Sequence, residues 1–109
     1  MALSLDQLLP QMLKAAEGVF AAKWPDVRSY AEGEFRKIGL DILRMEQMKL
    51  SGKITPEQAG LLLDIQKNAS RAVLLSLEGI GLIMAQNAIN AALGVIRDTV
   101  NKALGFVLL

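Results

Sequence analysis

The chain has 109 residues, which is the length of one domain, and it contains neither cysteine nor histidine. Those two absences exclude disulfides, thiolate nucleophiles, zinc fingers and Ser-His-Asp triads built from this chain alone. Hydrophobic residues make up 52% before the nine glycines are counted, whereas ordinary soluble chains hold about 45–50% with glycine included. Twelve basic and eleven acidic residues leave a net charge of +1, which argues against an electrostatic nucleic-acid binder.

The N-terminal half of the chain predicts two helices and no strand. Ser4 and Gln7 form the pattern of a capping box, and apolar residues then recur every three or four positions. A first helix is therefore expected over about residues 5–23. Pro25 interrupts it and suits the first turn of a second helix over about residues 26–50, because a proline there lacks an N–H that would be unpaired anyway.

A helical hairpin centred near residue 53 follows from the next segment. Gly52 is a natural left-handed helix end. Thr55, Pro56 and Gln58 then have the pattern of an N-cap, a first-turn proline and the closing residue of a capping box.

One long third helix is expected over about residues 56–104, with a break near residues 79–81 as the alternative. We prefer continuity because a loop at 79–81 would have almost no polar side chain for its freed backbone groups. The fold class is then all-α: a long hairpin in which the first two helices, separated at Pro25, pack antiparallel on the third. The whole chain, residues 1–109, forms a single helical domain.

The register of this hairpin predicts specific neighbours across it. Both arms rise equally per residue, so residues whose numbers add to about 106 lie opposite each other. Trp24 is then expected over the stretch 79–81, where the missing side chains of Gly79 and Gly81 leave room. Arg28 is expected to form a structural ion pair with Glu78.

The apolar face of the third helix is larger than one partner arm covers. Its polar residues occupy a single stripe, and well over half of the circumference is apolar, whereas a surface helix buries about 100°. We therefore expect obligate self-association of hairpins into a four-helix or larger bundle. The residues expected at this packing or oligomer interface are Trp24, Leu62, Ile65, Val73, Leu77, Ile80, Met84, Ala88 and Leu93.

No constellation of residues indicates catalysis, a cofactor or a metal. The di-metal sites of helical bundles need Glu-x-x-His pairs, and histidine is absent. Glu32 and Glu34 point to different sides of their helix. Neither a calcium-binding loop nor a phosphate-binding glycine loop is present. We expect a protein that is not an enzyme.

Two function classes remain. The first is a small non-enzymatic assembly or scaffold protein whose partner is a second copy of itself. The alternative is a membrane-active helical protein, such as a lysis, pore-forming or toxin component, that uses the apolar residues 73–96. Glu78 within that run costs about 2.5–3.5 kcal/mol on insertion scales, so the membrane alternative is less favoured. The start of the chain lacks the basic region of a secretory signal, and cytoplasm is the default expectation.

Overall fold

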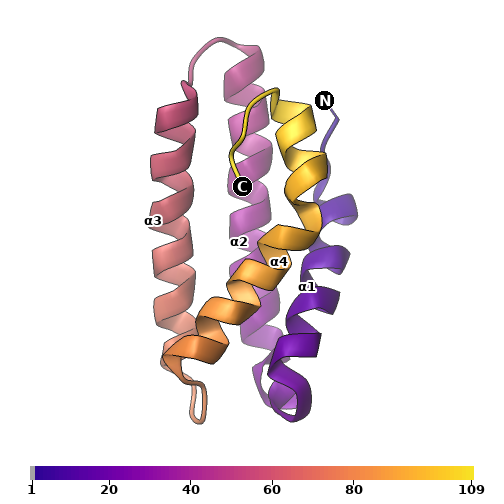
Figure 1. The fold of residues 1–109 in the computed structure, drawn as a ribbon, viewed down its shortest axis with the longest axis vertical. Helices are drawn as coiled ribbons and strands as arrows, with labels where there is room; N and C mark the ends of the chain where they lie inside the picture. Colours follow the sequence, from indigo (N-terminus) through magenta and orange to yellow (C-terminus); the bar gives the residue numbers. More distant parts are fainter. Residues whose placement is uncertain (1) are drawn as a thin grey trace.

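The computed structural model describes residues 2–109, which fold into an up-and-down four-helix bundle measuring 43 × 23 × 18 Å (Figure 1). Each helix runs antiparallel to the one before it, and the last crosses the bundle obliquely from the foot of the third to the N-terminal end of the first. The expectation of an all-α, bundle-like fold is confirmed. The helices are α1 (Leu5–Phe20), α2 (Trp24–Leu50), α3 (Pro56–Leu75) and α4 (Leu82–Leu104), with a 3-10 turn at Ala21–Lys23 between the first two.

The helix starts and the central hairpin follow the local sequence signals. The Ser4 hydroxyl accepts from the backbone N–H of Gln7 at 3.2 Å. At the start of α3, the Thr55 hydroxyl accepts from the N–H of Gln58 at 3.1 Å, and the Gln58 side chain accepts from the N–H of Thr55 at 2.9 Å. Gly52 has φ +67° in the turn between α2 and α3. The predicted hairpin near residue 53 is therefore confirmed.

The expectation of one continuous helix over residues 56–104 is wrong. α3 ends at Leu75, α4 begins at Leu82, and Gly79 between them has φ +79°. The backbone satisfies its own groups there, since the N–H of Ile80 donates to the carbonyl of Leu77 at 3.2 Å. The turn lies at the surface, and its backbone groups form hydrogen bonds with each other. The chain can therefore turn here without polar side chains.

The first two helices separate at Ala21 and not at Pro25. Ala21 has φ +51°, and Pro25 lies in the first turn of α2. The chain reverses at this turn. α2 therefore runs back alongside α1, and the two helices do not follow one another along a single axis. The first two helices therefore do not form one straight arm, but the expected pairing is present, since α1 packs on α4 and α2 packs on α3.

α4 is covered mainly by α1 of the same chain. Ala85, Ala88 and Ala92 on α4 have no exposed surface, and neither does Ala16 on α1. Small side chains let helices approach closely, so the apolar face expected to need a second chain is largely buried within this one. The largest fully buried side chains are Leu8, Met12, Phe20, Phe35, Ile38, Ile42, Leu74, Ile96, Val100 and Leu104.

Trp24 does not lie over residues 79–81, so that expectation is also wrong. Its ring stacks on Phe20 with centroids 6.1 Å apart and an interplanar angle of 25°. The ammonium of Lys23 occupies the space in which a Cβ at Gly79 would stand, and a Cβ at Gly81 would meet no atom within 4 Å. The start of α2 does lie beside the turn, but Lys23 is the residue that meets Gly79, while the Trp24 ring packs on Phe20.

Gly79→Ala should lower the free energy of unfolding by about 1–2 kcal/mol, because an alanine is disfavoured at φ +79°. Gly81→Ala is the matched comparison and should lower it by less than Gly79→Ala does. Gly81 has φ −88° and open space around it, so the only cost is that alanine is a poorer N-cap than glycine at the start of α4. Urea denaturation of both variants, each repeated with Trp24→Leu, measures the effects. Equal losses at the two glycines, or a loss at Gly79 that depends on residue 24, would contradict the turn.

Candidate functional site

The residues expected at an interface fall into three groups. Ile80, Ala88 and Leu93 are buried in the core of this chain. Trp24, Val73, Leu77 and Met84 are half-buried. Leu62 and Ile65, both on α3, are 44% and 66% exposed, so these two offer the most surface to another molecule.

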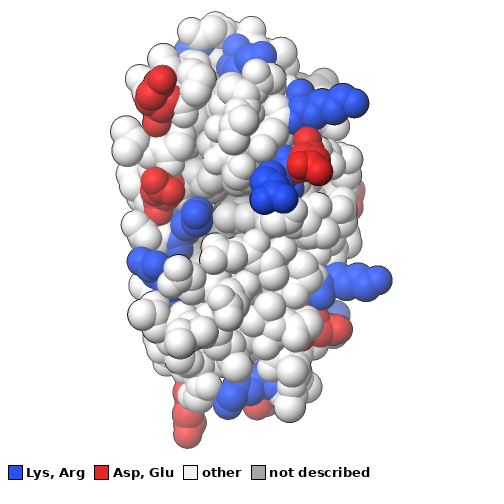
Figure 2. All heavy atoms as spheres, viewed as in Figure 1, with Lys and Arg blue, Asp and Glu red and all other residues white. Residues whose placement is uncertain are grey.

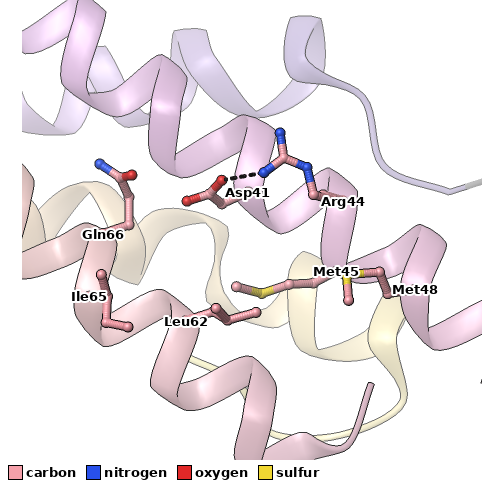
Figure 3. A pocket seen from close by; sticks show the side chains of 7 residues that line it. All are labelled: Asp41, Arg44, Met45, Met48, Leu62, Ile65 and Gln66. Atoms are coloured by element: carbon pink, nitrogen blue, oxygen red, sulfur yellow. Dashed lines mark hydrogen bonds and ion pairs between the residues drawn. The ribbon is translucent and has the colours of Figure 1, made fainter. Parts of the chain in front are cut away.

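Leu62 and Ile65 line an apolar groove between α2 and α3 (Figure 3). Met45 and Met48 reach across from α2 towards Leu62, and the ion pair of Asp41 with Arg44 lies on the α2 rim. This hollow has a volume of about 200 Å³, and a second one of about 290 Å³ adjoins it at Met48 and Leu62. We call the two together the α2–α3 groove. Its lining residues are Asp41, Arg44, Met45, Met48, Lys53, Ile54, Gln58, Leu61, Leu62, Ile65 and Gln66.

An uncharged apolar face of α3 continues from this groove. Its members recur at helical spacing and are all exposed, and we call them the α3 stripe: Leu61, Leu62, Ile65, Ala69 and Ala72. The charged residues Asp64, Lys67 and Arg71 lie on the side of α3 that faces α4. The helical period therefore separates an apolar side of α3 from a charged one.

The groove has the composition of a binding surface. Met48 is half-buried, and methionine side chains adapt their shape to an apolar partner. The polar groups stand at the rim, where Arg44 is 68% exposed and bonds Asp41 at 3.2 Å. An apolar floor with a polar rim is typical of protein interfaces.

The expected ion pair of Arg28 with Glu78 is not formed. Both residues are exposed, and none of the ion pairs within residues 2–109 joins them. Glu78 lies in the turn after α3, beside Lys23 and Asp26. Glu78 therefore lies beside the first residues of α2, and Arg28 lies further along that helix with its side chain exposed.

Two buried carboxylates lie on α2: Glu34, which the sequence analysis considered only as a metal ligand, and Glu46, which it did not single out. Glu34 is 6% exposed and accepts from the ammonium of Lys37 at 3.1 Å. Glu46 is 3% exposed and accepts from the backbone N–H groups of Ala2 and Leu3, each at 3.2 Å. The spacing of three residues between Glu34 and Lys37 is a local signal that would have found the first pair. No local pattern indicates the contact of Glu46 with a segment 43 residues away.

Within residues 2–109, no three potential metal-ligating side chains come together. No helix of this described part combines the length and the hydropathy needed to span a membrane. The apolar run 73–96 is divided by the turn between α3 and α4. Comparison with known protein families, curated proteins and solved structures finds no match to this chain.

Proposed function

We propose that this chain is a small non-enzymatic assembly protein that binds a second copy of itself through the α3 stripe and the adjoining α2–α3 groove. The exposure of large apolar side chains on this uncharged helix face carries the proposal: Leu61 is 65% exposed and Ile65 66%. Burying one such side chain fully contributes about 1.5–3 kcal/mol. A face of this kind is stabilised when another apolar surface covers it.

The order of side chains along α3 supports a second copy as the occupant. When two α3 helices pack antiparallel, with a two-fold axis crossing between Ile65 and Ala69, two of the large residues of the α3 stripe each lie opposite an alanine. Leu62 then faces Ala72 of the second copy, and Ile65 faces its Ala69. Two-fold symmetry needs a surface that complements itself in this way.

The same arrangement creates an intermolecular bundle. Each copy contributes α2 and α3, so the contact consists of four helices around a new apolar layer. α3 has 20 residues, and at 1.5 Å per residue it offers a contact about 30 Å long. The methionines of the groove widen it on the α2 side.

Ile65→Glu should weaken self-association by at least about 100-fold, or about 2.8 kcal/mol. The new carboxylates of both copies would lie close to the two-fold axis, in an apolar layer that desolvates them. Sedimentation velocity across a dilution series measures the shift towards the 11.8 kDa monomer.

Ile83→Glu is the matched control. Ile83 is 76% exposed on a different helix, so this variant should associate as the unaltered chain does. Circular dichroism checks that both variants stay helical. An unaltered chain that is monomeric at high concentration, or equal behaviour of the two variants, would refute the proposal.

A further inference from the structure

A second groove lies between α3 and α4, on the opposite side of α3 from the α2–α3 groove. Figure 2 shows it as a shallow hollow with basic side chains on both of its sides and acidic side chains next to them. It consists of two adjoining parts of about 400 and 300 Å³ that share Asp64, Lys67 and Asn90. We call it the α3–α4 groove. The other residues of the first part are Gly60, Leu63, Leu93, Gly94, Arg97, Leu108 and Leu109, and those of the second part are Asn68, Arg71, Gln86 and Ile89.

The lining of the groove carries an excess of positive charge, because three basic side chains stand against one acidic side chain: Lys67, Arg71 and Arg97 against Asp64. Lys67 and Arg71 are half-buried one helical turn apart, and no ion pair within residues 2–109 joins either of them to a carboxylate. Arg71 donates to the side-chain oxygen of Asn68 at 3.0 Å. Like charges at this spacing repel each other along a helix, so an anion placed between them would be favourable.

One end of the groove is open and has leucines among its lining residues, beside polar and charged ones: Leu63, Leu93, Leu108 and Leu109, with Asp64, Lys67, Asn90 and Arg97. Leu63 and Leu93 are buried at 3% and 7% exposure. Gly60 and Gly94 stand nearby inside their helices, and a Cβ at either would meet no atom within 4 Å. Glycine weakens a helix interior relative to alanine, and here the missing side chains leave the groove wide.

We propose that the α3–α4 groove binds a small amphiphilic anion, with its phosphate or carboxylate group at Lys67 and Arg71 and its apolar body towards Leu93 and Gly94. The side-chain amides of Gln86 and Asn90 line the same part of the groove and supply hydrogen-bond donors. Charged and apolar contacts in one concave site are what a ligand of this class needs. This proposal is independent of self-association, because the α3 stripe lies on another side of α3.

Titration of the full chain with phenyl phosphate, followed by NMR of the side-chain amides, tests the site. We expect saturable shifts at Asn68, Gln86 and Asn90, and weaker binding at high salt. Phenol and inorganic phosphate, each lacking one half of the ligand, should bind at least tenfold more weakly. Benzoate in place of phenyl phosphate reveals which anionic group is preferred, and either preference supports the proposal.

Substitutions separate a built site from general attraction to a basic surface. Lys67→Met and Arg71→Met should each weaken phenyl phosphate binding at least tenfold without lowering the melting temperature, because each removes one of two repelling charges. Lys14→Met removes an exposed cation from α1 and should change the affinity less than twofold. Gly94→Leu, which fills the open end, should weaken phenyl phosphate more than inorganic phosphate. Shifts that spread over the surface without saturating, or equal effects of Lys14→Met and Lys67→Met, would overturn the proposal.

Discussion

Phe20→Ala should lower the free energy of unfolding by about 3–5 kcal/mol. Phe20 is 1% exposed and is the last residue of α1, where its ring stacks on Trp24. The substitution would leave a cavity beside the turn that reverses the chain into α2, and it would remove the aromatic stacking. The loss is a large fraction of the about 5–15 kcal/mol that stabilises a typical domain.

Urea denaturation followed by circular dichroism measures this loss. Tyr30→Ala is the control, since Tyr30 is 51% exposed on α2 and its truncation should cost less than about 0.5 kcal/mol. Phe20→Leu, which keeps most of the apolar volume, gives a smaller and measurable loss if the alanine variant does not fold. A cost of Phe20→Ala no larger than that of Tyr30→Ala would mean that the end of α1 is not packed in the core.

Lys37→Met should cost about 1–3 kcal/mol, because it leaves the carboxylate of Glu34 buried without its partner. The side chain of Glu34 is 8% exposed, and the Lys37 ammonium is its one hydrogen-bond donor within residues 2–109. Most of the Lys37 side chain remains in water, since it is 60% exposed. The cost therefore comes from the stranded acid more than from the lost cation.

A double-mutant cycle tests this pair. Glu34→Leu combined with Lys37→Met should cost less than Lys37→Met alone, because the apolar replacement removes the buried charge. Arg28→Met is the control; Arg28 is exposed and has no ion pair in the described chain, so its loss should stay below about 0.5 kcal/mol. Additive effects at Glu34 and Lys37 would show that the two residues do not stabilise each other.

The two proposed surfaces use opposite sides of α3. The α3 stripe faces away from the bundle and carries no charge, whereas Lys67 and Arg71 face α4. This separation makes the two proposals testable one at a time, since Ile65→Glu leaves the α3–α4 groove intact and Lys67→Met leaves the α3 stripe intact.

Residues close together in the chain were sufficient to specify the starts of α1 and α3 and the α2–α3 hairpin. Thr55 and Gln58 bond each other across one turn of backbone, and Gly52 ends α2 with a positive φ. Such contacts can be read from the local sequence, because every atom involved belongs to one short segment. Leu62 and Ile65 also belong to this hairpin. They lie opposite Arg44 and Asp41, as the register centred on residue 53 predicts.

The turn between α3 and α4, the burial of Glu34 and Glu46, and both grooves depend on contacts between distant segments. Periodicity reveals that α4 has an apolar face but not which helix covers it. Breaking the helix at Gly79 costs helical hydrogen bonds, and the burial of Ala85, Ala88 and Ala92 against α1 offsets that cost. This favourable burial joins residues about 70 positions apart in the chain. The sequence near residue 79 therefore gives no sign of it. The same holds for the α3–α4 groove, whose two walls meet only because the chain turns there.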